Sequence, residues 1–514
     1  MLATVSPRSI LQVVLSAAFG RLATALSQIV AAVYLSPTDF GVYAAAVGIT
    51  TVTTALRAGG TGNHVQTMTP AEFECDAGRF FRYSIVFTAF GAVLTMALAW
   101  PIAHWFASSN AYPLRDLITT TLVIGGSFVV FNLNVFPRAR MIAFLRLGEI
   151  SLLDTITGAI KFFGTWVLAR AGYGPMALAG SILIAQTVES CWTWLRSGLR
   201  PSSLRPQGPW FRATFIEMRL PLVVGLMVTL NSQTDSLVGS AFLPAAVLGY
   251  YYFASQLAVQ PASLVGNTLR SVFTATTAQV RGDENKEHAS LRTIFNGAMV
   301  FMPLVTMLIP TVFDSFERTI WGGKWADAYY PVLILSATLV YPAALQLVSA
   351  PIAGVRDWKL AIRLDLLRGV SKIVPAFAAS IFIVLLNLNA LTSAIVLSAA
   401  VGAVSAVVAS RELYRIIVRS GMSRQTVLYE LYSTPLAALL SALAAAGLAH
   451  SATEPFRLHL GQQLSSAIEC VLAGFFYICC ALTLLRFGYT ETLVRLIGAL
   501  PDFMQPFAKR LFVI

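Results

Sequence analysis

The stretch Leu153–Lys161, LDTITGAIK, places an aspartate and a lysine inside an apolar run long enough to cross a lipid bilayer. A second stretch, Leu364–Lys372, LDLLRGVSK, shares the leading Leu-Asp, the glycine and the final lysine at the same spacing. A charge at the bilayer centre costs at least about 2.5–3.5 kcal/mol on insertion scales, so it needs a wet cavity or a partner charge. The recurrence of this costly pattern predicts that the chain contains two copies of one membrane unit.

The composition places the whole chain in the membrane class. Of its 514 residues, 56% are hydrophobic and 12% are charged, and the mean hydropathy is +0.71. A soluble domain is about a quarter charged. We therefore expect an all-α membrane protein with about 14 transmembrane helices. The predicted spans are 9–35, 40–60, 80–106, 114–136, 149–169, 174–196, 214–241, 246–275, 291–313, 330–354, 360–386, 390–418, 432–450 and 463–486.

The basic residues are distributed asymmetrically over these spans. With both termini on the cytoplasmic side, most of the 36 lysines and arginines fall in inner loops and at inner helix ends. The outer loops hold only Arg115, Arg170, Arg318, Lys324 and Arg457. This bias is the positive-inside rule, so the net charge of +12 reflects membrane topology rather than binding of nucleic acid.

The internal repeat extends beyond the two opening stretches. With an offset of 208 residues, LSPTDFGVYAAA from Leu35 aligns with LPAAVLGYYYFA from Leu243, which pairs Gly41 with Gly249. We predict two six-helix lobes in parallel repeat, followed by two further helices. The predicted domains are 1–200 (N-lobe), 201–212 (cytoplasmic linker), 213–420 (C-lobe), 421–488 (the last two helices) and 489–514 (an amphipathic cytoplasmic helix). The YYYFA segment predicts an interfacial aromatic belt.

The charges within the spans admit two interpretations. Asp154, Gly158 and Lys161 share one helix face, and the glycine permits another helix to approach closely. In one interpretation the buried cations line a cavity and bind an anionic group. In the other, each cation pairs with a carboxylate and only fixes helix register. The pairs in that case are Arg21 with Asp235 and Lys161 with Asp154.

The candidate residues fall into three groups. We expect substrate-binding cations at Arg21, Arg57, Lys161 and Lys372. Carboxylates for ion coupling or counter-charge are expected at Asp154, Asp235 and Asp365. Polar lumen or gating positions are expected at Asn231, Gln233, Gln256, Gln260 and Pro261.

Two further stretches carry a resemblance to a known family. SPTDFGVYAAAVGIT at 36–50 follows a helix that bears Arg21, and FPRARMIAFLRLGEI at 136–150 leads into the fifth span. Together with the two six-helix lobes, these stretches resemble the polysaccharide (Wzx-type) flippases of the multidrug/oligosaccharidyl-lipid/polysaccharide (MOP) exporter superfamily. The resemblance covers roughly residues 8–490.

The resemblance implies a flippase in the bacterial inner membrane. It would move undecaprenyl-pyrophosphate-linked oligosaccharide repeat units from the inner to the outer leaflet by alternating access, for export of exopolysaccharide, capsule or O-antigen. The resemblance places Arg21, Lys161 and Lys372 on the pyrophosphate or on acidic sugars. It also implies H+ or Na+ as a coupling ion and a transient association with a polymerase and a co-polymerase. Lipid II flippases carry several arginines in the first two helices, where this chain has only Arg21 and Arg57.

Two alternative functions stay open. One is an ion-coupled multidrug or small-molecule antiporter of the same superfamily. The other is a membrane polysaccharide polymerase or glycosyltransferase, which usually needs a larger outer loop than this chain offers. The sequence has no phosphate-binding P-loop, no HExxH, no GxSxG and no Cys-x-x-Cys pair. We therefore predict a transporter with no catalytic residue, no metal site and no cofactor.

Overall fold

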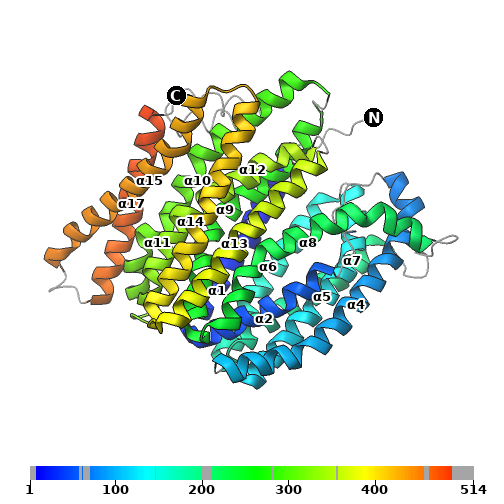
Figure 1. The fold of residues 1–514 in the computed structure, drawn as a ribbon, viewed down its shortest axis with the longest axis horizontal. Coiled ribbons are helices and arrows are strands. Elements are labelled where there is room, and N and C mark those ends of the chain that lie inside the picture. The colour runs from blue at the N-terminus through cyan, green and yellow to red at the C-terminus, as the bar shows by residue number, and fades with distance from the viewer. Residues whose placement is uncertain are drawn as a thin grey trace. The chain divides into compact units, whose positions relative to one another are not determined.

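The computed structural model is built from helices throughout the part of the chain that it describes (Figure 1). It describes residues 7–56, 61, 70–110, 112–144, 146–199, 210–279, 282–354, 357–456 and 462–488, and these contain no β-strand. A helix satisfies its own backbone hydrogen bonds, which is what a segment in hydrocarbon requires because no water is available there. The predicted all-α membrane class is confirmed.

The helices follow the predicted spans closely. They are α1 (Pro7–Tyr34), α2 (Pro37–Leu56), α4 (Pro70–Asn110), α5 (Leu114–Ala143), α6 (Leu147–Arg170), α7 (Met176–Ser197), α8 (Trp210–Phe242), α9 (Ala245–Gln279), α10 (Glu284–Ile320), α11 (Tyr329–Thr338), α12 (Val340–Gly354), α13 (Trp358–Leu386), α14 (Ala390–Arg419), α15 (Arg424–Thr453) and α17 (Gln462–Gly488). The predicted span 330–354 covers two helices, α11 and α12, because the α-helix is interrupted at Leu339.

Nine segments of the described residues are long and apolar enough to cross a membrane by length and composition. They are Phe73–Asn110, Leu114–Met141, Gly148–Arg170, Glu284–Ile320, Ala326–Ile352, Lys359–Leu386, Ala390–Arg419, Arg424–Thr453 and Gln462–Arg486. The protein is therefore a multi-pass membrane protein, and the count of 14 crossings stays a prediction.

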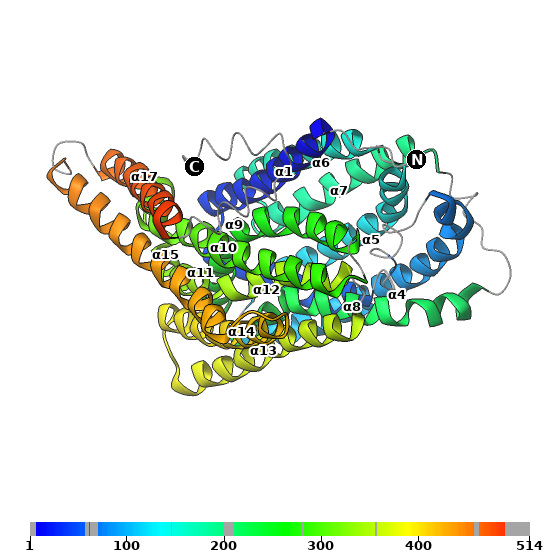
Figure 2. The same ribbon diagram turned by 90° about the horizontal axis from the view of Figure 1, so that it is seen from above.

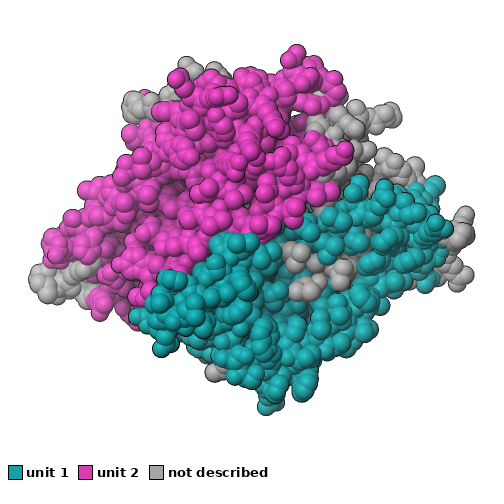
Figure 3. All heavy atoms as spheres, in the orientation of Figure 1, with its two compact units in different colours: residues 1–252, 372–390 teal, residues 253–371, 391–514 magenta. Residues whose placement is uncertain are grey.

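The chain forms two compact units (Figure 3). Unit 1 comprises residues 1–252 and 372–390, and unit 2 comprises residues 253–371 and 391–514. The divisions fall within α9, after Tyr252, and within α13, after Ser371. Helices α4 and α8 belong to unit 1 alone. The predicted lobe boundaries rest on the sequence repeat and stay predictions.

Unit 1 is organised by close packing of helix pairs. Helix α1 packs along α6, α2 along α8, and α5 lies against both α4 and α7 (Figures 1 and 2). One aromatic core, around Phe80, Tyr83 and Phe136, joins α4 and α5 to Met218 of α8. Gly158 lies against the Cα atom of Gly20. Because Gly158 has no side chain, α1 can approach α6 closely, as the sequence predicts.

Unit 2 is organised around α10. This helix contacts α11, α12, α15 and α17, and its buried face contributes to two apolar cores. One buried hydrogen bond, from the hydroxyl of Tyr477 to the carbonyl oxygen of Leu304 at 2.7 Å, joins α17 to α10. The last two helices, α15 and α17, are thereby fixed to the rest of unit 2.

The two turns that open α2 and α9 cross each other within unit 1 at a pair of glycines. A methyl group on Gly41 would overlap the carbonyl oxygen of Ala245, and one on Gly249 would overlap that of Pro37. The contact is reciprocal, because each glycine faces the residue four positions before the other, and the same offset of 208 relates both pairs. Only glycine lacks the Cβ atom that this approach excludes.

We predict that Gly41→Ala lowers the stability of the protein by about 1–3 kcal/mol, because the added methyl group must displace backbone rather than a flexible side chain. The measurement is the thermal unfolding midpoint of the purified protein in detergent. Gly126→Ala in α5 is the matched control, since nothing lies within 4 Å of the added group. Equal midpoints for the two variants would contradict the tight crossing.

Candidate functional site

Lys372 is held by a main-chain carbonyl rather than by a carboxylate. Its side chain is half-buried in α13, and its Nζ donates to the carbonyl oxygen of Asn231 on α8 at 2.9 Å. Within the described part of the chain, no carboxylate lies at ion-pair distance from this ammonium group. An ammonium carries three donors and Asn231 takes one of them. The positive charge is thus anchored in place and keeps the capacity to bind an anion.

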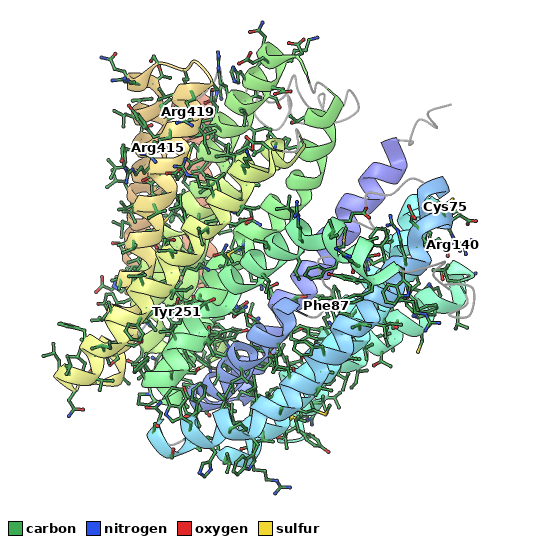
Figure 4. The ribbon with its side chains drawn as sticks, turned by 45° about the vertical axis from the view of Figure 1, so that its right-hand side comes forward. Cys75, Phe87, Arg140, Tyr251, Arg415 and Arg419 are labelled. Carbon is green, nitrogen blue, oxygen red and sulfur yellow. The ribbon has the colours of Figure 1, made fainter. Side chains whose placement is uncertain are left out.

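Asp235 lies one turn further along α8 and is deeply buried, with 7% of its surface exposed. Its Oδ2 accepts a hydrogen bond of 2.5 Å from the hydroxyl of Tyr251 on α9, which Figure 4 labels. Because residues four apart share a helix face, Asn231 and Asp235 belong to the same side of α8. We call Lys372, Asn231, Asp235 and Tyr251 the α8 cluster.

Two further buried tyrosines lie near Tyr251 of the α8 cluster. Tyr252 follows Tyr251 on α9 and packs edge-on against Tyr43 of α2, with ring centroids 5.8 Å apart. All three tyrosines are buried, and Tyr251 is only 1% exposed. The prediction that YYYFA forms an interfacial aromatic belt is therefore wrong for Tyr251 and Tyr252. The local sequence offered no sign of this, because the hydroxyl partner of Tyr251 comes from another helix.

Asp154 is engaged by an arginine that the sequence did not single out as a site residue. Arg138 of α5 donates to both carboxylate oxygens of Asp154, at 2.8 and 3.0 Å, and also pairs with Glu189 of α7. The three side chains are between 12% and 30% exposed. This triad ties α5, α6 and α7 together, so the pairing of Asp154 with Lys161 is not found among the described residues.

Lys161 stands apart from these pairs. It is half-buried in α6, one turn beyond the glycine that contacts α1, and it has no carboxylate partner among the residues that the structure describes. Arg21 belongs to the helical part of α1 directly after Gly20, at this same crossing, although its side chain lies outside the described part. Arg57 lies outside the described residues altogether.

The remaining candidates lie on α8, α9 and α13. Asp365 pairs with Arg368, three residues further along α13, at 3.2 Å. Gln233 is half-buried on α8. Gln256, Gln260 and Pro261 belong to the part of α9 in unit 2, where both glutamines are half-buried and the proline is buried within the helix. The described residues contain no group of three metal-ligating side chains.

Solved structures of two transporters have a similar fold. The structure is similar to "Lipid II flippase MurJ, inward closed conformation", with a TM-score of 0.65 and 12% identity over 94% of this chain and 99% of that one. It is also similar to an inward-facing multidrug resistance MATE family transporter of the MOP superfamily, with a TM-score of 0.54 and 14% identity over 82% and 96%. The fold is that of the MOP transporters.

The family follows from the sequence comparison. A model described as "Polysaccharide biosynthesis protein" matches residues 29–330, so the chain belongs to the polysaccharide biosynthesis protein family. The amylovoran biosynthesis protein AmsL of Erwinia amylovora is 24% identical over 190 residues, which span 35% of this chain and 46% of that protein. The chain is thus a polysaccharide-family member with a MOP transporter fold, and the predicted family is confirmed.

Two substitutions distinguish the structural role of Arg138 from the proposed binding role of Lys161. We predict that Arg138→Met lowers stability by roughly 2–3 kcal/mol, because it leaves two partly buried carboxylates without their partner. Lys161→Met is the matched control and should stay within about 0.5 kcal/mol of the wild type, because it removes no described contact. Thermal unfolding in detergent measures both. A larger loss for Lys161→Met than for Arg138→Met would reverse this assignment.

Proposed function

We propose that the protein is a flippase that moves undecaprenyl-pyrophosphate-linked oligosaccharide repeat units from the inner to the outer leaflet of the bacterial inner membrane. The product would serve export of exopolysaccharide, capsule or O-antigen. Membership in the polysaccharide biosynthesis protein family and the MOP transporter fold support this assignment. In this proposal both termini are cytoplasmic, as the distribution of basic residues suggests.

The observation that carries the proposal is the anchoring of Lys372. A lysine paired with a carboxylate inside the membrane is neutralised, and its purpose is then structural. Lys372 instead donates to a neutral carbonyl, which positions the ammonium group and leaves its charge uncompensated by any described carboxylate. A charge held in this way favours an anion strongly, because the surrounding dielectric is low. The pyrophosphate of a lipid-linked sugar is such an anion.

The other cations extend the proposed site. Lys161 is half-buried and unneutralised in the described structure, and Arg21 follows the glycine at which α1 and α6 meet. We assign both to the same pyrophosphate or to acidic sugars of the repeat unit, and Arg57 to the cytoplasmic mouth. In unit 1, the half-buried Gln233 would offer hydrogen bonds to sugar hydroxyls. Gln256 and Gln260 stay predicted polar positions of α9.

The α8 cluster also offers a route to ion coupling. Asp235 lies on the same face of α8 as the carbonyl that holds Lys372, and it is deeply buried. Neutralising this carboxylate with H+ or Na+ would alter the field at Lys372, because Asp235 lies one helical turn, about 6 Å along the axis, from the residue whose carbonyl holds the lysine. Release of the ion would then be linked to release of the substrate anion. The two six-helix lobes of the sequence repeat would provide the alternating access, with Pro261 as a flexible point in α9.

A substitution series tests the proposed site. We expect Arg21→Ala, Lys161→Ala and Lys372→Ala each to weaken binding of undecaprenyl-pyrophosphate-linked glycan to the purified protein by roughly 10- to 100-fold. Polysaccharide export in a strain that lacks the native gene should fall in parallel. Lys359→Ala, an exposed lysine on the same helix as Lys372, is the matched control and should leave both readouts unchanged. Normal binding and export in all three folded variants would eliminate the site.

Two observations favour a second function. The buried Asp235 and the fold shared with a multidrug resistance transporter would also suit an ion-coupled antiporter of small molecules. The antiporter predicts that deletion of the gene increases susceptibility to cationic drugs without loss of surface polysaccharide. The flippase predicts the reverse, together with transient association with a polymerase and a co-polymerase of the same pathway.

A further inference from the structure

The surface of unit 1 contains a groove whose lining residues do not belong to the proposed transport site. Helices α4, α5 and α7 contribute Phe81, Arg82, Ile85, Leu133 and Trp194 to it, and its volume is about 340 Å³. That volume is within the range of small-ligand pockets. The surface that lines the groove is entirely apolar, so Arg82 contributes the hydrocarbon part of its side chain to it. Because the Arg82 side chain is exposed, its guanidinium group adds one cation beside this apolar surface.

Arg82 is available for an external ligand. Its side chain is exposed, and it makes neither an ion pair nor a hydrogen bond with any residue that the structure describes. Arg79, one turn earlier on α4, pairs with both Asp76 and Glu217 at 3.0 Å. The charge of Arg82 is consequently not compensated within the described protein.

The groove lies where the hydrocarbon region begins. After Arg82, residues 83–110 of α4 contain no Asp, Glu, Lys or Arg. On α5, Leu133 comes five residues before the first charge of the helix end, Arg138, and on α7 Trp194 comes two residues before Arg196. Arginine and tryptophan are the side chains that gather at the boundary between hydrocarbon and head groups.

The apolar wall of the groove is rigid. The indole Nε1 of Trp194 donates to the carbonyl oxygen of Leu133 at 3.1 Å, which fixes the ring across from α5. Phe81 is buried and packs edge-on against Phe136 and Trp194, with ring centroids 5.2 and 6.0 Å away. A wall that is already ordered loses little entropy when a flexible chain lies against it.

We propose that this groove binds an anionic phospholipid of the membrane. The phosphate contacts the guanidinium group of Arg82, and one acyl chain lies along Ile85, Leu133 and the ring of Trp194. Charge complementarity favours this occupant over a zwitterionic lipid, because an uncompensated arginine near a membrane surface attracts anionic head groups. The site is separate from the α8 cluster, so the proposal does not rest on the proposed transport function.

Photo-crosslinking with lipids that carry a diazirine in the acyl chain tests this site directly. Purified protein is exposed to photoactivatable phosphatidylglycerol or phosphatidylcholine, and labelled peptides are mapped by mass spectrometry. We expect phosphatidylglycerol to label the groove segments of α4, α5 and α7 about fivefold more than phosphatidylcholine does. Arg82→Gln should remove this preference while leaving the protein folded.

Two further variants and one competitor complete the test. Leu133→Trp, or Ile85→Trp if the first variant does not fold, should fill the groove and reduce labelling by both lipids. Arg212→Gln removes another exposed arginine, on α8 outside the groove, and should leave labelling unchanged. Wild-type labelling in Arg82→Gln, or in the folded groove-filling variant, would overturn the proposal. Full competition by glycerol 3-phosphate, which has no acyl chain, would also overturn it.

Discussion

The cost of an uncompensated charge in hydrocarbon governs the arrangement of this protein. Each buried ionisable group must find a partner, a wet cavity or a polar main-chain atom. Asp154 and Glu189 share Arg138, and Asp235 accepts a hydrogen bond from a tyrosine. Lys372 is held by a main-chain carbonyl instead of by a carboxylate. The same rule that neutralises the carboxylates therefore leaves this cation available to an anion.

Close helix contacts complement this electrostatic arrangement. In a membrane, helices associate through packing of small residues rather than through removal of apolar surface from water. Gly41 and Gly249 permit the openings of α2 and α9 to cross, and Gly20 and Gly158 do the same for α1 and α6. Gly249 of the first crossing comes two residues before Tyr251 of the α8 cluster, and Gly20 of the second crossing directly precedes Arg21. Both groups of proposed site residues thus stand next to a glycine contact.

The proposed transport site and the proposed lipid site both depend on cations that have no described carboxylate partner. Lys161 and Lys372 have no described carboxylate partner, and in the proposed function they would meet an anion brought in as substrate. Arg82 keeps its charge at the edge of the hydrocarbon region, where anionic head groups of the bilayer are available. Arg138 shows the contrasting case, since its charge is compensated by two carboxylates and it joins three helices.

The sequence by itself determined the membrane class, the positions of the helices and the repeat, because long apolar runs, Gly and Pro breaks and recurring residues are local features of the chain. It also identified Lys161, Lys372 and Asp235 as costly charges. Only the tertiary structure decided which partner each charge has. Asp154 meets Arg138, Asp235 meets Tyr251, and Lys372 meets a carbonyl 141 residues away. Periodicity places a side chain on a helix face, but the neighbouring helix that faces it depends on packing between distant segments.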